Sequence, residues 1–232
     1  MAPERDPSVA TLPQDDRVLL VEQLGRRSYG EVLELQREYA RERIAGHRPD
    51  TLLLVEHDPV VTLGRSTKKE HLLLNEQALA SRGIELFEIE RGGDVTYHGP
   101  GQLVGYPIFD LQQHRQDLHW YLRQIEQVLI DALGEMGIDA GRNPPHTGVW
   151  VGSRKVASIG VHARQWVTWH GFALNVSTDL SYFDVMVPCG IAGVEMTSVS
   201  RELGRLIDLS TVSGHVIDAF AAGFGFRSLS DA

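Results

Sequence analysis

Three things are scarce in this sequence: cysteine, long apolar runs and positive charge. Its 232 residues include one cysteine, so the chain cannot form an internal disulfide and does not call for an oxidising compartment. No apolar stretch reaches the roughly 20 residues that a transmembrane helix needs. The start, Met1 to Asp6, also lacks the basic flank and apolar core of a signal peptide. From these absences we expect a cytoplasmic protein that does not bind a membrane.

The acidic balance of the chain bears on its partners. Acidic side chains number 31 and basic ones 22, which gives a formal charge of -9. Because nucleic-acid-binding domains usually carry a basic surface, this charge argues against nucleic-acid binding. An acidic protein partner would need a local basic patch, for which Arg65, Lys68, Lys69 and Arg91 are candidates. The two lysines would fit an ordinary solvated surface equally well.

The remaining composition is that of an ordinary globular protein. Hydrophobic residues make up 42% and charged residues 23%, without a repeat or a low-complexity tract. Residues 1–16 are rich in proline and aspartate, so we expect them to form a mobile tail. A single domain is then expected at residues 17–232.

Short β-rich runs and a few amphipathic helices predict a mixed α/β (α+β) fold. The expected strands are residues 18–21, 51–56, 60–63, 84–89, 103–109, 149–151, 155–161 and 166–176, and the expected helices are residues 29–46, 118–136 and 211–222. Ser28 and Glu31 have the spacing of a helix capping box. The strands at 51–56 and 60–63 look like adjacent buried strands. Residues 91–102 are too rich in glycine for regular structure, so we expect a shaped loop there.

Cys189 is the first candidate for a catalytic residue. It stands between Pro188, which restricts the backbone, and Gly190, which lets the backbone bend or approach a ligand closely. A thiol is nucleophilic only as a thiolate, and the reference pKa of about 8.5 must be lowered by a nearby cation. Without other motifs, a lone cysteine is more often a small core residue. Cys189 therefore needs a partner to act as a nucleophile.

Four side chains are candidates for that partner. His98, His162 and His170 all lie in segments that could line a pocket, and spacing alone does not choose between them. Lys155 begins an apolar run, which carries its side chain toward the core if the strand has the right phase. Burial or a charged neighbour can bring a lysine from its reference pKa of about 10.4 into the catalytic range. A lysine near a turn is usually exposed, so residue chemistry alone favours histidine.

The glycine-rich segment at residues 91–102 is a candidate binding loop. Its glycines give the backbone freedom, and Arg91, Thr96, Tyr97 and His98 supply hydrogen-bond donors, which suits an extended ligand. It lacks both the Gly-Lys-Ser/Thr ending of a P-loop and the Gly-x-Gly-x-x-Gly of dinucleotide folds, so a nucleotide site is weakly supported. Residues 170–175 would suit a strand beside an acyl chain or an ordinary core strand.

Taken together, four motifs resemble the lipoyl(octanoyl) transferase family. They are Arg91-Gly92-Gly93-x-x-Thr96-Tyr97-His98-x-x-Gly101-Gln102-x-Val104-x-Tyr106, Arg154-Lys155-Val156-Ala157-Ser158-Ile159-Gly160, His170-Gly171-Phe172-Ala173-Leu174-Asn175 and Pro188-Cys189-Gly190-Ile191. Their order and spacing match along nearly the whole domain. The resemblance implies a fold shared with lipoate and biotin protein ligases, with a larger and a smaller β-sheet flanked by helices. Residues 17–232 would then be one octanoyltransferase catalytic domain.

The resemblance also implies a reaction and its partners. An octanoyl group would pass from octanoyl-acyl carrier protein, the donor, to a lysine of a lipoyl domain, as the first step of endogenous protein lipoylation. The acceptors would be the E2 subunits of 2-oxoacid dehydrogenases and the glycine-cleavage H protein. Thioester exchange followed by amide formation needs no nucleotide, so we expect no cofactor and no metal.

Particular residues match the functional positions of the family. Cys189 matches the acyl-accepting nucleophile, and Lys155 matches a partner that lowers the thiol pKa and acts as acid and base. The matching substrate-binding residues are Arg91, Gly92, Gly93, Asp94, Val95, Thr96, Tyr97 and His98 in the loop, with Ser158, Ile159, Gly160, Gly171, Phe172 and Ala173 on two strands. Three alternatives remain: an ATP-dependent lipoate or biotin ligase, a cysteine thioesterase, and a non-catalytic module that binds lipoylated domains.

Overall fold

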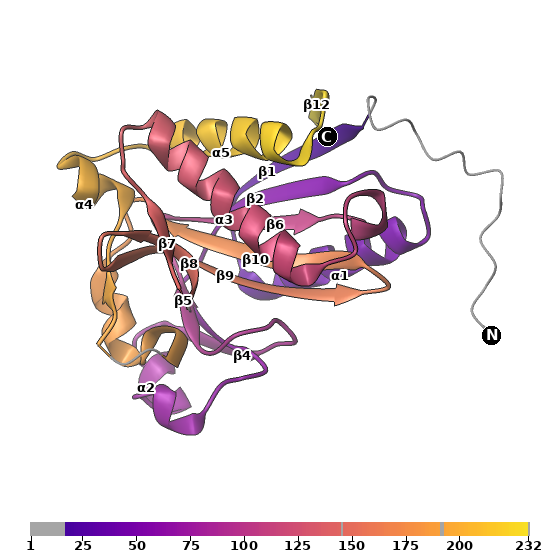
Figure 1. Ribbon diagram of the computed structural model, residues 1–232. Coiled ribbons are helices and arrows are strands. Elements are labelled where there is room, and N and C mark those ends of the chain that lie inside the picture. Colours follow the sequence, from indigo (N-terminus) through magenta and orange to yellow (C-terminus); the bar gives the residue numbers. More distant parts are fainter. Residues whose placement is uncertain (1–16, 145, 191–192, 232) are drawn as a thin grey trace.

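The computed structural model describes residues 17–144, 146–190 and 193–231, without the side chains of Cys189 and of residues 228–231. Residues 1–16, for which a tail was expected, lie outside this part. Among the described residues the chain forms a nine-stranded and a three-stranded sheet with helices around them (Figure 1). The expected mixed α/β fold with a larger and a smaller sheet is confirmed.

The large sheet forms the centre of the molecule. Its strands follow the order β12-β1-β2-β6-β10-β9-β8-β7, and β11 pairs with β9 outside that order. These strands are β1 (Val18–Arg27), β2 (Thr51–His57), β6 (Gln102–Ile108), β7 (Gly141–Asn143), β8 (His146–Val151), β9 (Arg154–Arg164), β10 (Val167–Asn175), β11 (Glu195–Met196) and β12 (Ser228–Asp231). The pairs β2–β6, β6–β10 and β10–β9 are antiparallel.

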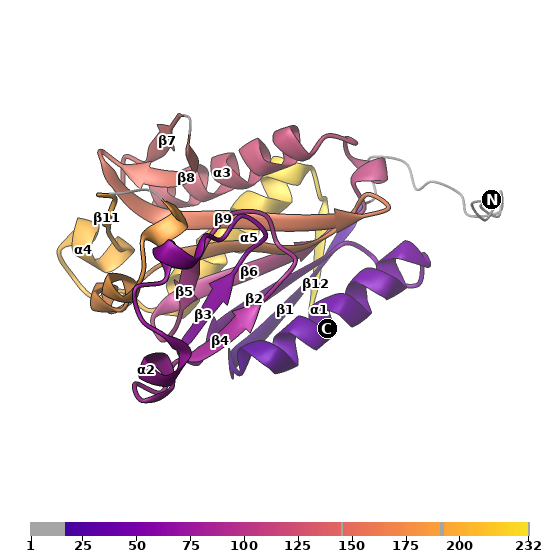
Figure 2. The same ribbon diagram turned by 90° about the horizontal axis from the view of Figure 1, so that it is seen from below.

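Helices cover both faces of this sheet. The helix α1 (Tyr29–Ile44) lies on one face, and α3 (Leu118–Glu135) and α5 (Leu209–Phe224) lie side by side on the other (Figures 1 and 2). Side chains of β2 alternate accordingly, because Leu52 and Leu54 pack with α3 and α5 whereas Leu53 packs with α1. Burial on both faces explains why β2 reads as a continuous apolar run.

The small sheet has the order β4-β3-β5 and lies at one side of the large sheet (Figure 1). It comprises β3 (Val60–Leu63), β4 (Glu85–Glu88) and β5 (Thr96–His98), with the short helix α2 (Glu76–Ala80) beside β4. Its apolar side packs on the 3-10 helix at Leu180–Val185, where Tyr97 stacks on Tyr182 with ring centroids 4.8 Å apart. The smaller helix α4 (Val199–Leu203) follows β11.

Three local expectations were wrong. The expected neighbours β2 and β3 are consecutive in the chain but belong to different sheets, since the turn at Asp58-Pro59 redirects the backbone. The loop at residues 91–102 contains the strand β5, because pairing with β3 overrides its glycine-rich flanks. Ser28 is the N-cap of α1, but its side chain makes no capping hydrogen bond, so the capping box does not form.

Candidate active site

A cavity of about 240 Å³ opens where the loop before β5 meets β6, β9 and β10. Typical small-molecule sites measure roughly 300–1,000 Å³, so this one suits a small ligand. Its walls are formed by Tyr29, Arg91, Gly93, Asp94, Val95, Thr96, His98, Val104, Tyr106, His146, Thr147, Lys155, Ser158, Ile159, Gly160, His170, Gly171, Phe172 and Ala173.

The cavity brings together most of the residues singled out in the sequence. Lys155 and the two strand segments at residues 158–160 and 171–173 line it, as do six residues of the loop at 91–98. Gly92 and Tyr97 do not. Side chains alternate along β5, so Thr96 and His98 face the cavity while Tyr97 packs against Tyr182 on the other side.

Arg91 is an anchor of the loop. Its side chain is buried, and Nη2 donates to the carbonyl oxygen of Thr62 at 2.8 Å and to Thr62 Oγ1 at 2.9 Å. The loop also packs on glycine, since a Cβ on Gly160 would lie 2.7 Å from the carbonyl oxygen of Gly92. Arg91 therefore cannot belong to the basic surface patch considered above, whereas Arg65, Lys68 and Lys69 are exposed.

A chain of buried amides determines the tautomer of His98. Asn175 Nδ2 donates to the carbonyl oxygen of Thr197, so Asn175 Oδ1 must accept, and it does so from Gln102 Nε2 at 2.9 Å. Gln102 Oε1 is then left to accept from His98 Nδ1 at 2.8 Å. Neutral His98 consequently carries its proton on Nδ1 and a lone pair on Nε2.

Burial keeps two histidines of the cavity wall, His98 and His170, neutral. Burial, assisted by repulsion from His57, lowers the pKa of His98 to about 3, and burial lowers that of His170 to about 3 as well. His170 sits in the left-handed region at φ 57°, and its N–H donates to Gln36 Oε1 at 3.0 Å. Its Nε2 is buried without a hydrogen-bond partner among the described residues. An apolar ligand would therefore meet neutral imidazoles at His98 and His170.

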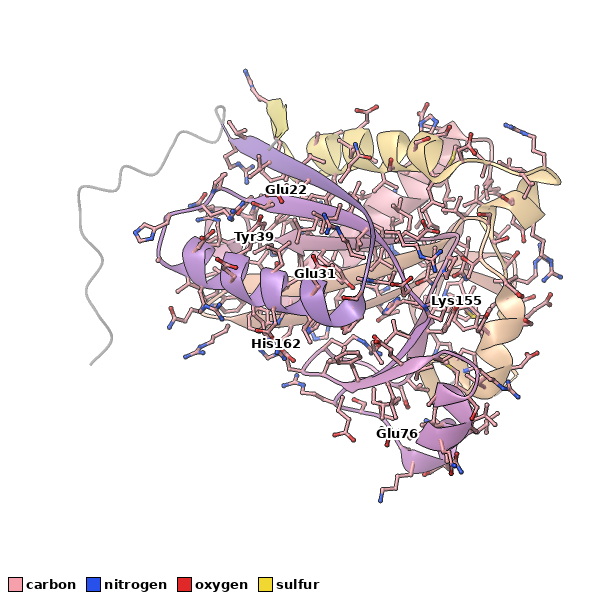
Figure 3. All side chains as sticks on the ribbon, turned by 180° about the vertical axis from the view of Figure 1, so that it is seen from behind. Glu22, Glu31, Tyr39, Glu76, Lys155 and His162 are labelled. Carbon is pink, nitrogen blue, oxygen red and sulfur yellow. The ribbon has the colours of Figure 1, made fainter. Side chains whose placement is uncertain are left out.

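Lys155 is 1% exposed and forms part of the cavity wall near the entrance to β9. Its Nζ lies 5.6 Å from the ring centroid of Trp150, within the range of a cation–π contact. Gly148 leaves room for the side chain, since a Cβ there would lie 2.6 Å from Lys155 Cε. Figure 3 shows Lys155 on the side of the large sheet toward the small sheet, and His162 near α1 instead.

A buried carboxylate holds Gly148 in place. Glu126 of α3 is fully buried and accepts from the Gly148 N–H at 3.0 Å, while Arg123 and Arg142 neutralise its charge at 2.6 and 2.9 Å. Such a paired carboxylate is stable in the interior, whereas an unpaired one is not. The helix α3 thereby determines where β8 passes Lys155.

The backbone around Cys189 is tied down on both sides. Before it, Val187 N–H donates to the carbonyl oxygen of His71 at 2.8 Å. After it, β11 pairs with β9, and Thr197 N–H donates to the carbonyl oxygen of Lys155 at 2.9 Å. The side chain of Cys189 lies outside the described part of the structure. Its backbone belongs to the 3-10 turn Pro188–Gly190.

Several cavity residues had not been singled out as binding residues in the sequence. Tyr29, Val104, Tyr106, His146, Thr147 and His170 come from four separate elements and close the remaining walls. Val104 and Tyr106 fall within the first motif, so their alternation with Leu103 along β6 could have indicated them. Tyr29 lies on α1, and no local signal connects it with the loop.

The fold and the site define a class of protein. Residues 28–221 match the lipoyl protein ligase A/B catalytic domain. The solved structure of a lipoate-protein ligase A bound with ATP superposes with a TM-score of 0.70 at 20% identity, covering 94% of this chain and 89% of that one. A bipartite lipoate protein ligase of Thermoplasma acidophilum gives 0.69 at 19% identity, over 94% and 87%. At these identities the structures show the fold alone.

Curated relatives identify the family within this class. An octanoyltransferase of Solibacter usitatus is 52% identical over 210 residues, which span 90% of this chain and 94% of that protein. Another, of Rubrobacter xylanophilus, is 49% identical over 203 residues, or 87% and 91% of the two chains. The chain therefore belongs to the octanoyltransferase family.

Two further features bear on the chemistry and the location of the described residues. No group of three or more histidine, cysteine, aspartate and glutamate side chains in this part of the chain could hold a metal ion. None of the helices described is long and apolar enough to cross a membrane.

Neutral burial of His98 predicts a loss of stability in acid. Its pKa falls from 6.5 to about 3 on folding, so below about pH 6.5 the unfolded state binds more protons, and the free energy of unfolding decreases as the pH is lowered. His98→Asn keeps a donor toward Gln102 but does not titrate. Between pH 7 and pH 5 the free energy of unfolding, measured in urea, should decrease by about 2 kcal/mol more for the wild type than for this variant. His47 is exposed, and His47→Asn should keep the wild-type dependence of the free energy of unfolding on pH. The same dependence in His98→Asn would contradict the neutral burial of His98.

Gly148→Ala should destabilise the protein through Lys155. The added Cβ would lie 2.6 Å from Lys155 Cε and 2.7 Å from the carbonyl oxygen of Ala157, at a φ of 137°. Overpacking of this kind typically costs about 1–3 kcal/mol, beyond the backbone strain. Gly152→Ala is the matched control, because it also has a positive φ, 59°, but no atom within 4 Å of the new Cβ. If both variants lost the same free energy of unfolding in urea, the close contacts of the new Cβ at position 148 would not contribute to the loss.

Proposed function

We propose that this chain transfers an octanoyl group from octanoyl-acyl carrier protein to a lysine of lipoyl domains, through a thioester on Cys189. The observation that carries the proposal is the buried Lys155 on the wall of a small, largely apolar cavity, with β11, which follows the Cys189 turn in the sequence, paired to the strand of that lysine. Relatives that are named octanoyltransferases supply the reaction. The acceptors would be E2 lipoyl domains and the glycine-cleavage H protein.

In the first half-reaction, the Cys189 thiolate attacks the carbonyl carbon of the incoming thioester. The bond between that carbon and the carrier sulfur breaks, the carrier leaves as a thiolate that takes back from Lys155 the proton of the Cys189 thiol, and the acyl group stays on Cys189. One thioester replaces another, so no nucleotide has to drive the step. An ATP-dependent ligase would instead activate a free acid, and the requirement for ATP and magnesium separates the two.

Lys155 would control the protonation and charge of the Cys189 sulfur in both half-reactions. Its ammonium form stabilises the thiolate, and its amine form takes the thiol proton. Because Lys155 is buried, little water screens its charge from a nearby anion. The charge of the leaving Cys189 thiolate is stabilised in the same way when the acyl group moves on.

Walls of the cavity would bind the acyl chain. Phe172, Ile159 and Val104 are apolar, and Tyr29 and Tyr106 present ring surface. Each methylene in such a pocket contributes only about 1–3 kcal/mol, so chains one carbon pair longer or shorter than octanoyl should also react, more slowly.

Intact-mass measurement tests the central claim. Octanoyl carrier protein is mixed with the enzyme, without ATP or magnesium and before any lipoyl domain is added. The wild type should gain the mass of one octanoyl group, and Cys189→Ala should gain none, because the nucleophile is absent. An adduct that persists in Cys189→Ala contradicts the proposal, and octanoate without transfer to a lipoyl domain identifies a thioesterase.

Loss of Lys155 should weaken the thiolate. In Lys155→Ala the thiol pKa should rise toward the reference value of about 8.5, and acylation at pH 7 should slow by about 10-fold to 100-fold. The pH profile of thiol alkylation measures the pKa directly. Arg41→Ala removes an exposed positive charge from α1 and is the control. An alkylation profile shared by Lys155→Ala and the wild type would mean that Lys155 does not tune the thiol.

A further inference from the structure

A histidine–aspartate pair lies beside the backbone of the Cys189 turn. His71 Nδ1 is 2.6 Å from Asp94 Oδ2, and the two side chains are 17% and 10% exposed. Asp94 lines the cavity, whereas His71 ends the 3-10 helix at Lys69–His71, outside the cavity wall. The pair therefore connects the ligand site with the outer side of the turn.

Gly190, the neighbour of Cys189, packs directly on this pair. A Cβ at position 190 would lie 2.5 Å from Asp94 Oδ2 and 2.8 Å from His71 Cε1, and the backbone has a φ of 66°. Only glycine fits both constraints. On the preceding side, a β-bridge joins Leu72 to Met186 and continues the hydrogen bond between Val187 and His71. His71 is thus attached to the cysteine turn through both its backbone and its ring.

The contact with Asp94 determines which nitrogen of His71 can act. An ionised carboxylate only accepts hydrogen bonds, so the proton of neutral His71 is on Nδ1 and its lone pair is on Nε2. Asp94 is itself held, because its Oδ1 accepts from the Val95 N–H at 2.7 Å. A base oriented by a fixed carboxylate is the arrangement that general-base catalysis requires.

We propose that His71, oriented by Asp94, accepts the proton that the acceptor lysine loses when it attacks the Cys189 thioester; this inference rests on the proposed function. The lysine nitrogen forms a bond with the octanoyl carbonyl carbon, and the carbon–sulfur bond breaks with its electrons going to Cys189. The proton on nitrogen passes to His71 Nε2. The imidazolium that results is paired with the Asp94 carboxylate and later returns its proton to solvent.

Lys155 and His71 would act on different protons because the two side chains differ in exposure to solvent. Lys155 is 1% exposed and would act on the sulfur from inside the cavity. The acceptor lysine arrives from solvent on another protein, and the more exposed ring of His71 lies on a surface turn beside Lys68 and Lys69. A proton leaving the amine can reach solvent from His71 without crossing the acyl site.

The two half-reactions measured separately test the inference. Octanoyl-enzyme is first formed and quantified by intact mass, then mixed with a lipoyl domain, and single-turnover transfer is followed. His71→Asn retains a donor toward Asp94 in place of Nδ1 but has no group in place of Nε2. Cys189 should be acylated within about twofold of the wild-type rate, and transfer to lysine should slow by about 100-fold. Asp94→Asn, which retains an acceptor without charge, should slow transfer by about 10-fold.

Each other outcome overturns the inference in a recognisable way. Transfer at the wild-type rate in His71→Asn means that Nε2 takes no proton. Equal slowing of both half-reactions means that His71 only holds the cysteine turn. If His71→Asn fails to fold, unchanged transfer in Asp94→Asn still contradicts the pair. Exposed His47→Asn is the matched control for the substitution. Absence of an adduct on the wild type would instead remove the proposed function itself.

Discussion

The buried amide of Gln102 connects the parts of the molecule on which the site depends. Its nitrogen donates to the carbonyl oxygen of Tyr97 in the small sheet and to Asn175 in the large sheet, and its oxygen accepts from His98. Asn175 in turn donates a hydrogen bond to the carbonyl oxygen of Thr197, which follows the Cys189 turn in the sequence. Buried polar networks of this kind stabilise one arrangement strongly, because any broken bond leaves an unsatisfied group. Gln102 thereby sets the relative position of both sheets and the cysteine segment.

Charge is distributed around the cavity in a consistent pattern. Histidines that face the interior are held neutral by burial, with the pKa of His170 and of His98 lowered to about 3. Ionised groups of the wall instead have fixed polar partners, as Arg91 has in Thr62 and Asp94 in His71. An isolated charge in the interior would cost several kcal/mol, which is why these buried charges are held by polar partners.

Local patterns in the sequence predicted much of the fold. The apolar period over residues 118–136 corresponds to α3, because burial on one face imposes the helical period on its side chains. The β-branched run at 60–63 corresponds to β3, whose first three residues are all buried. The assignment of β3 to a second sheet was not predictable, since it depends on a change of direction at Asp58-Pro59. Strand β5 was missed because glycine content describes a segment alone, without the partner that pairs with it.

For the site, sequence motifs indicated the cavity walls but not their supports. Lys155 and Phe172 belong to recognisable motifs and meet at the cavity. Glu126, which positions Gly148 beside Lys155, sits in an ordinary amphipathic helix where an acidic residue reads as solvent-exposed. His71 and Asp94 are 23 positions apart and come together only through the folding of the small sheet. Such contacts join residues that are far apart in the sequence, so the local spacing of residues does not predict them.

Gly190 also limits how this part of the chain can evolve. A larger side chain there would collide with a carboxylate and an imidazole that are already bonded to each other. A larger residue at position 190 would therefore require a smaller or displaced side chain at position 71 or 94, and it would still be strained by the φ of 66°. Positions 71, 94 and 190, which are distant in the sequence, are therefore coupled beside the cysteine. A substitution at one of them has to be compatible with the side chains at the other two.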